Sequence, residues 1–218
     1  MNIYLIPGLG GDKRMYEGQL AKFPHTKVLE FIDPLPNESI SSYAYRLAEG
    51  IDKNEEFILV GVSLGGILAQ EIAVHYPPKK TIIISSVKSS KELPKWMRFF
   101  KYFPLPKLIP GSLYLWMFML SMWVKTLGSK SNHILANLKN MARDAKPKFV
   151  YWGANQVLKW ENPIPSFKAY HIHGNKDYLF PIGRIQNLGT EVEGGTHAMI
   201  LTHVLQINEA LAKELNIA

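Results

Sequence analysis

Three residue types that together activate a hydroxyl group stand out in the sequence: a serine, an aspartate and a histidine. Ser63 lies in Gly-Val-Ser-Leu-Gly, which fits the pattern G-x-S-x-G. Asp177 ends the string His-Gly-Asn-Lys-Asp, and His197 ends Gly-Gly-Thr-His. A serine hydroxyl is a weak nucleophile and needs a base that a third group holds in place. These residues therefore predict acyl transfer, with Ser63 as nucleophile, His197 as general base and Asp177 as the acid that orients it.

The surroundings of Ser63 make the five-residue pattern informative. An apolar run, FILV, precedes it, and the helix-like string LGGILAQEIAVHY follows it. A sharp turn between a buried strand and a helix presents the serine at the carboxyl edge of a sheet, and the flanking glycines let strand and helix approach closely. The alternative is a glycine-rich packing turn whose serine caps the helix. The coincidence of strand, turn and helix favours the nucleophile.

Other residues compete for the same roles. Asp177 and His197 each follow a predicted strand directly, which places them at the same sheet edge as Ser63. His203 is a rival base, but it falls within a predicted helix. Asp144 is a rival acid, but it does not follow a strand. His171 and His173 are spaced as a metal pair on a strand; since no further ligand cluster accompanies them, we interpret them as structural.

Acyl transfer also requires backbone N–H groups that stabilise the oxyanion of the tetrahedral intermediate. One donor is expected from Leu64, directly after the nucleophile. The other is expected from the glycine-rich turn at residues 7–11, with Leu9 preferred and Gly10 as the alternative. A nucleotide-phosphate loop is disfavoured, because Lys13 stands where G-x-G-x-x-G needs its third glycine.

The elements that must position these residues alternate between short apolar runs and helical patterns, which is typical of βαβ units and an α/β fold. The pattern predicts a mostly parallel sheet of about six strands flanked by helices. Strands are expected at residues 2–6, 27–31, 57–62, 81–85, 168–173 and 190–192. Helices are expected at residues 15–23, 39–53 and 64–76, from 147, after 181, and from about 197 to the C-terminus.

The alternation stops between residues 88 and 165, where the sequence predicts several short helices and no strand. We therefore divide the chain into a core, residues 1–87 and 166–218, and an inserted segment, residues 88–165. Residues 88–148 hold twelve Lys or Arg and two acids, a net charge of +10. No base-reading or stacking motif accompanies this charge, so we expect no nucleic-acid partner.

The amino-acid composition excludes several classes of protein. The chain has 218 residues, 47% of them apolar, and no cysteine, which excludes a disulfide scaffold, a thiol nucleophile and cysteine metal sites. Residues 1–8 lack a basic leader, so we expect no signal peptide and a cytoplasmic protein. The apolar run at residues 113–124 is about half the ~20 residues that a membrane-spanning helix needs.

These motifs resemble those of the α/β-hydrolase superfamily over nearly the whole chain outside the insertion. GVSLGG resembles its nucleophile elbow, HGNKDYLFP its acid loop and GGTHAMI its histidine loop. The resemblance implies a triad of Ser63, Asp177 and His197, no metal or organic cofactor, and a helical cap at residues 88–165. It also implies a minimal sheet that lacks the first two strands of larger members. One departure is Pro7-Gly8, where many members have His-Gly.

The expected function is that of a serine hydrolase that cleaves an ester or related acyl bond through an acyl-enzyme. Alternatives are an acyl thioesterase, a lipase-like enzyme, a lyase with the same triad, and a non-catalytic small-molecule-binding member of the fold. The predicted cap is rich in aromatic and methionine side chains, which suit a lipophilic substrate or simply attach the cap to the core. Its charge suits an anionic substrate, contact with an anionic membrane surface, or a solvated face. These apolar residues are Trp96, Met97, Phe99, Phe100, Trp116, Met117, Phe118 and Trp123.

Overall fold

A computed structural model describes residues 1–100, 102, 132–162 and 169–216, and a six-stranded sheet lies at its centre. The strand order is β2-β1-β3-β4-β5-β6, and every neighbouring pair is parallel. The predicted α/β class and six-stranded sheet are confirmed, and the sheet is fully rather than mostly parallel. The strands are β1 (Asn2–Ile6), β2 (Thr26–Val28), β3 (Phe57–Val62), β4 (Lys80–Ile84), β5 (Tyr170–Gly174) and β6 (Thr190–Val192).

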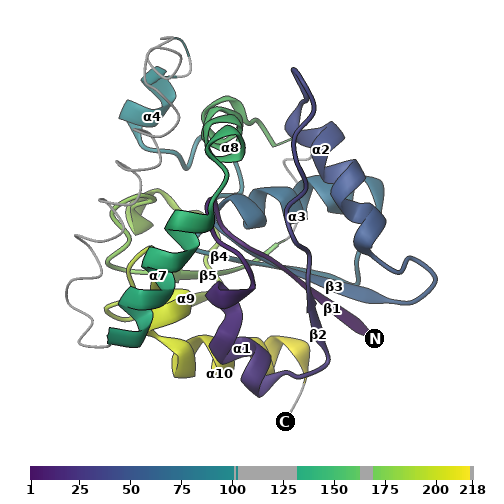
Figure 1. Cartoon of the computed structure of the whole chain (residues 1–218). Coiled ribbons are helices and arrows are strands. Elements are labelled where there is room, and N and C mark those ends of the chain that lie inside the picture. Colours follow the sequence, from purple (N-terminus) through teal and green to yellow (C-terminus); the bar gives the residue numbers. More distant parts are fainter. Residues whose placement is uncertain (101, 103–131, 163–168, 217–218) are drawn as a thin grey trace.

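Helices cover both faces of the sheet (Figure 1). One layer holds α2 (Ile40–Leu47), α3 (Leu64–His75) and α8 (Pro147–Lys159). The other holds α1 (Glu17–Lys22), α7 (Asn132–Asp144), α9 (Met199–Thr202) and α10 (Val204–Leu215). Between β4 and β5, α4 (Lys95–Phe100) precedes α7 and α8. Short 3-10 turns span Lys13–Tyr16, Ala48–Gly50 and Ile182–Arg184.

The alternation of side chains along a strand explains the two cores. In β1, Tyr4 and Ile6 pack with α2 and α3, whereas Ile3 and Leu5 pack with the helices of the opposite layer. Successive residues of a strand point to opposite faces, so an apolar strand fills both cores. All six residues of β3 are buried in this way. The sheet is therefore a rigid platform for the loops at its carboxyl edge.

The second strand and the C-terminal helix differ most from the structure, and the helix expected at residues 39–53 ends at Leu47, where a 3-10 turn to Gly50 follows. The second strand was expected to reach residue 31, but β2 ends at Val28. After Leu29, whose N–H donates to the Leu5 carbonyl, the chain leaves the sheet and Phe31 packs against Phe149 with ring centroids 4.4 Å apart. Phe31, which the sequence pattern assigned to a strand, thus packs against α8 instead, because tertiary packing overrides local β propensity.

The C-terminal helix is the second difference. It was expected from about residue 197, but it begins at Met199 and is broken at His203, which has φ −122° and ψ 44°. The break separates α9 from α10. Ahead of α9, the Met199 N–H donates to the Thr196 carbonyl at 3.0 Å, so residues 196–198 form a turn and not a helical start.

The segment expected as a cap is described in part. Its helices α4, α7 and α8 lie between β4 and β5, whereas residues 101, 103–131 and 163–168 lie outside the described residues. The division into core and cap at residues 88–165 stays a prediction. Of the residues expected to make the cap apolar, Trp116, Met117, Phe118, Trp123 and the Phe100 side chain also lie outside the description.

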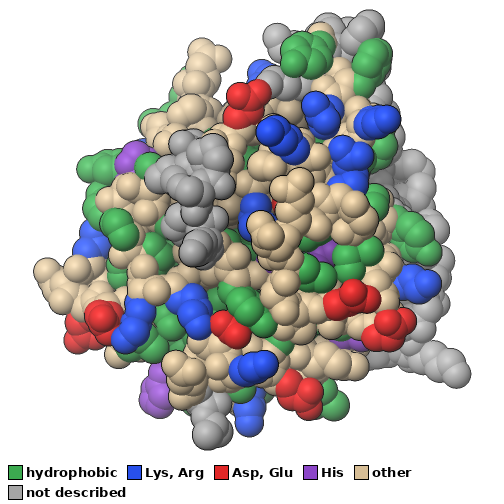
Figure 2. Space-filling view, turned by 180° about the vertical axis from the view of Figure 1, so that it is seen from behind, with side chains coloured by type: hydrophobic (Ala, Val, Ile, Leu, Met, Phe, Trp, Pro, Cys, Tyr) green, Lys and Arg blue, Asp and Glu red, His purple; other side chains and the backbone are tan. Residues whose placement is uncertain are grey.

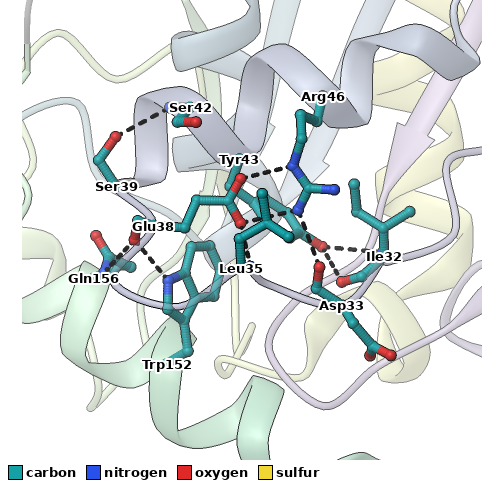
Figure 3. Close-up of polar contacts among 10 residues, drawn as sticks. All are labelled: Ile32, Asp33, Leu35, Glu38, Ser39, Ser42, Tyr43, Arg46, Trp152 and Gln156. Carbon is teal, nitrogen blue, oxygen red and sulfur yellow. Dashed lines mark hydrogen bonds and ion pairs between the residues drawn. The ribbon is translucent and has the colours of Figure 1, made fainter.

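A polar cluster fastens α8 and the loop after β2 to α2 (Figure 3). Arg46 forms an ion pair with the buried Glu38 carboxylate, with Nε 2.7 Å from Oε1. The Tyr43 hydroxyl donates to the Ile32 carbonyl at 2.9 Å. From α8, the Trp152 indole N–H donates to the Glu38 carbonyl at 2.9 Å. Helix α8, distant in sequence, is therefore joined to α2 and to the loop that precedes α2, beside the sheet's carboxyl edge.

Basic side chains are unevenly spread over the surface. Figure 2 shows several Lys and Arg side chains gathered near the top of one face, below exposed apolar side chains. Two of the basic residues expected in the segment 88–148 bond to the core: Lys146 forms an ion pair with Asp33 at 2.8 Å, and Lys88 donates to the carbonyls of Gln186 and Asn187. None of the helices within the described ranges is long and apolar enough to cross a bilayer.

Candidate active site

Ser63 occupies a strained turn between β3 and α3. Its φ of 53° and ψ of −117° lie in a region that non-glycine residues rarely adopt. The Ser63 N–H donates to the Ile84 carbonyl at 3.0 Å, and the Ser86 hydroxyl donates to the Ser63 carbonyl at 2.7 Å. These bonds hold the strained residue, so the turn has the features expected of a nucleophile elbow.

The glycines on each side of Ser63 are required by close backbone approach. A Cβ on Gly65 would lie 2.1 Å from the Ile6 carbonyl oxygen, and one on Gly61 would lie 2.1 Å from the Gly65 carbonyl oxygen. No side chain fits such gaps, because these neighbours are backbone atoms. The G-x-S-x-G spacing therefore lets α3 start directly against β1 and β3.

A second close approach joins the loops that carry Asp177 and His197. A Cβ on Gly174 would lie 2.1 Å from the Gly195 carbonyl oxygen. The same carbonyl accepts the Lys176 N–H at 2.9 Å. The loops after β5 and β6 are thus packed backbone to backbone, which brings the acid and the histidine together.

The structure places the three predicted residues in one hydrogen-bonded row. His197 Nδ1 lies 2.8 Å from Asp177 Oδ2, and His197 Nε2 lies 3.0 Å from Ser63 Oγ. A carboxylate only accepts, so Nδ1 carries the proton and Nε2 is free to accept the Ser63 hydroxyl proton. This tautomer is the one a general base needs.

The Asp177 carboxylate is buried and fully engaged. Its Oδ1 accepts the N–H groups of Leu179 at 2.9 Å and Phe180 at 3.0 Å, while Oδ2 faces His197. Burial alone would raise the pKa of Asp177, but the attraction and hydrogen bond of His197, together with the Phe180 N–H, hold that pKa below its ordinary value. Asp177 is therefore a carboxylate at neutral pH.

Two histidines that the sequence analysis treated as structural lie directly behind this acid. His173 Nε2 is 2.7 Å from the Phe180 carbonyl and 3.6 Å from Asp177 Oδ2, and His171 Nε2 is 3.1 Å from His173 Nδ1. Burial lowers the pKa of both imidazoles, that of His171 to about 2. Their spacing of two on the strand before the acid was the available signal, since it places both on one face.

The turn at residues 7–11 lies against Ser63. A Cβ on Gly8 would lie 3.4 Å from Ser63 Cβ. The Gly11 N–H donates to the Gly8 carbonyl at 2.9 Å, which leaves Leu9 and Gly10 as the turn residues whose N–H groups have no acceptor among the described residues. Leu64 is the first residue of α3, where N–H groups have no intrahelical partner. Leu64 therefore directly follows the nucleophile, and Leu9 follows Gly8, the turn residue that lies against Ser63.

Helix α8 covers this region with apolar contacts. A Cβ on Gly153 would lie 2.6 Å from Leu9 Cδ1 and 3.0 Å from Leu64 Cδ2, so both leucine side chains reach this helix. A cavity of about 120 Å³ adjoins the turn at Gly10 and Gly11, although Ser63 does not line it. Its wall also includes Phe31 and Phe149. Part of the predicted cap therefore lies over the candidate oxyanion residues.

The rival residues lie elsewhere. His203 Nδ1 lies 2.9 Å from Thr202 Oγ1 in the break between α9 and α10. Asp144 pairs with Arg14 at 2.9 Å. Within the described ranges, no group of three or more His, Asp or Glu is arranged to hold a metal ion.

Comparisons with known proteins give structural relatives. No family model matches the sequence, and no curated protein matches it significantly. MenH from S. aureus superposes with a TM-score of 0.79 at 15% identity, covering 99% of this chain and 93% of that one. An esterase from Thermogutta terrifontis gives 0.76 at 14%, covering 99% and 89%. The Bacillus megaterium epoxide hydrolase gives 0.68 at 14%, covering 99% and 93%.

At these identities the likeness concerns the fold and not the reaction. The chain has the α/β-hydrolase fold.

Proposed function

We propose that the protein is a serine hydrolase that cleaves an ester or related acyl bond through an acyl-enzyme. The observation that carries the proposal is the row of contacts from Ser63 Oγ through His197 to the buried Asp177 carboxylate, at 3.0 and 2.8 Å. A nucleophile, a base and an orienting acid in this order constitute the machinery of acyl transfer.

In the first half of the reaction, Ser63 Oγ attacks the substrate carbonyl carbon while His197 Nε2 takes the hydroxyl proton. Asp177 stabilises the resulting imidazolium through the Nδ1–H bond. The N–H of Leu64, with that of Leu9 or Gly10, stabilises the oxyanion, and a donor of this kind is worth roughly 3–4 kcal/mol. The tetrahedral intermediate then collapses, and His197 returns the proton to the leaving alcohol.

In the second half, water replaces the alcohol. His197 Nε2 takes a proton from water, whose oxygen attacks the acyl carbon bound to Ser63 Oγ. Collapse of this second intermediate breaks the ester to the enzyme and returns the proton to Ser63. The free carboxylic acid leaves, and the enzyme is restored without any other reactant.

One further observation supports an acyl substrate. The structural relatives include proteins titled as esterases, one at 19% identity and a TM-score of 0.64. Others are titled as an epoxide hydrolase and a non-heme bromoperoxidase, so the assay must include other reactions.

The deciding experiment compares wild type with Ser63→Ala and a matched control, Ser41→Ala. Ser41 Oγ also lies 3.2 Å from a histidine Nε2, that of His75, but on the surface of α2. We expect p-nitrophenyl ester turnover and labelling by a fluorophosphonate probe in wild type and Ser41→Ala, and neither in Ser63→Ala. Wild-type turnover by Ser63→Ala would refute the proposal, and a folded wild-type protein inert to the probe would favour a binding module.

A substrate panel then refines the class. Short- and long-chain esters, acyl thioesters and an epoxide should be tested side by side, each against Ser63→Ala. Turnover of esters that disappears in Ser63→Ala supports the proposal. Turnover of thioesters alone would assign the thioesterase alternative.

A further inference from the structure

His173 occupies a position behind the acid that the acyl-transfer scheme does not use. It belongs to β5, it is fully buried, and its Nε2 lies 2.7 Å from the Phe180 carbonyl and 3.6 Å from Asp177 Oδ2. We infer that His173 is a positioning residue: its Nε2–H clamps the loop of Asp177 and so fixes the carboxylate that orients His197. The inference rests on the proposed function, because it concerns the same row of residues.

The proton on His173 can be assigned from its neighbours. A carbonyl oxygen only accepts, so the contact with Phe180 requires a proton on Nε2. In the neutral imidazole Nδ1 then accepts, and its partner at 3.1 Å is His171 Nε2. His171 must therefore carry its own proton on Nε2, which leaves its Nδ1 as an acceptor, buried without a partner in the described residues. One arrangement of protons satisfies His173 completely.

Hydrogen bonds hold the loop from Asp177 to Phe180 through both backbone groups of Phe180. The Phe180 N–H donates to Asp177 Oδ1 at 3.0 Å, while the Phe180 carbonyl accepts from His173. The backbone at Phe180 is thereby held from two sides, and the Phe180 ring meets the His197 ring edge-on at 5.2 Å. A loss of the His173 donor frees the carbonyl and lets the loop rotate. The carboxylate would then lose its fixed direction toward His197.

Burial favours the neutral form of His173 and outweighs the attraction of the Asp177 carboxylate, which favours the charged form. Burial lowers the pKa of His173, and the charged or titratable groups that act on the histidine pair are Asp177, His197 and Lys88. A second cation beside Asp177 would compete with the imidazolium of His197 for the same Oδ2. A neutral donor in this place holds the loop without that competition.

The test replaces His173 by glutamine or by asparagine, two amide side chains of different length. Glutamine places its terminal nitrogen near the position of a histidine Nε2, whereas asparagine ends near the position of Nδ1 and does not reach Phe180. We expect His173→Asn to lower kcat about 10- to 100-fold, the cost of a misplaced group at the site. We expect His173→Gln to recover most of the activity. KM for a p-nitrophenyl ester should change little in either variant.

The pH profile separates positioning from simple destabilisation. A carboxylate that faces His197 less directly stabilises its imidazolium less, so the acid limb of kcat/KM should move to lower pH in His173→Asn. The pH dependence of fluorophosphonate labelling should move with it. The matched control is Asn208→Leu, which removes buried hydrogen bonds to Gln19 and Gly18 on the far layer. It should lower the melting temperature without moving the limb.

The outcomes are distinct. An acid limb in His173→Asn that matches wild type, or a kcat within threefold of wild type, overturns the positioning role. So does a His173→Gln variant that is as impaired as His173→Asn. If His173→Asn does not fold, His173→Gln decides the question. A kcat and an acid limb close to those of wild type support the positioning role, and a large loss of kcat refutes it. Activity retained by Ser63→Ala would instead refute the proposed function itself.

Discussion

His197 Nε2 lies 3.0 Å from Ser63 Oγ, although 134 residues separate the two in sequence. The contact arises because parallel strands direct all their carboxyl ends to one edge of the sheet, where the loops after β3, β5 and β6 meet. The close approach of Gly174 and Gly195 fixes the last two of these loops against each other. Four further predictions follow from particular contacts.

The first concerns the tautomer of His197. In Asp177→Asn the carboxamide can still accept the Leu179 and Phe180 N–H groups, but its NH₂ group would face His197 Nδ1. Nδ1 would then have to accept, which leaves the proton on Nε2 and removes the base. By analogy with the equivalent change in a serine protease, we expect kcat to fall about 10⁴-fold. A fall of less than tenfold in ester turnover would contradict the role of Asp177.

The second concerns the elbow. In Gly65→Ala the new Cβ would lie 2.1 Å from the Ile6 carbonyl oxygen and 2.4 Å from that of Pro7, so backbone would have to move. We expect a loss of about 3 kcal/mol in unfolding free energy by urea titration, the upper end of the usual cost of overpacking, and loss of activity. Gly183→Ala is the matched control, because nothing lies within 4 Å of its Cβ. Equal stability of the two variants would argue against the close approach.

The third concerns stability against pH. Burial lowers the pKa of His171 from 6.5 to about 2 in the folded protein. The unfolded chain therefore binds the extra proton between these values, and the free energy of unfolding must fall as pH falls below about 6.5. Each such proton contributes a slope of about 1.4 kcal/mol per pH unit. We expect urea titrations at pH 5.0 to 6.5 to show a shallower slope in His171→Gln than in wild type.

A control for this measurement is His25→Gln, at an exposed position. It should leave the wild-type slope unchanged. The range above pH 5 lies above the ordinary pKa values from which those of Asp177 and Glu38 are lowered, about 3.8 and 4.5, so their contributions are lost only at lower pH. If the free energy of unfolding of His171→Gln depended on pH as steeply as that of wild type, the buried imidazole of His171 would not be the source of the pH dependence.

The fourth concerns the cluster of Figure 3. In Arg46→Met the Glu38 carboxylate loses its ion pair, and we expect a lower free energy of unfolding at pH 7, with a loss larger than that in a variant of an exposed pair. The Arg46 guanidinium lowers the pKa of Glu38, so the pair's contribution is present at neutral pH and is lost as pH falls below about 4.5. Lys79→Met breaks the exposed pair with Glu56 and should cost less than about 1 kcal/mol. Similar losses in both variants would contradict this assignment.

Much of the candidate site could be predicted because its signals are local. The apolar run before Ser63 and the glycines around it define a strand, a turn and a helix within a few residues, and those bounds agree with β3 and α3. The same holds for the loops of Asp177 and His197, each of which follows a strand. The predicted bounds were wrong where long-range packing determines the local structure. Phe31 lies outside the sheet and contacts Phe149, and the last helix is broken at His203.

The sequence by itself determined the elements and the three residues that its motifs single out, because backbone preference and side-chain periodicity act between near neighbours. Only the tertiary structure decided the strand order, the contact between Gly174 and Gly195, and the place of His173 behind Asp177. These features depend on which distant segments pack together. The spacing of His171 and His173 on their strand is the same whether the two side chains lie in an apolar core or beside an acid, so the sequence could not distinguish these cases.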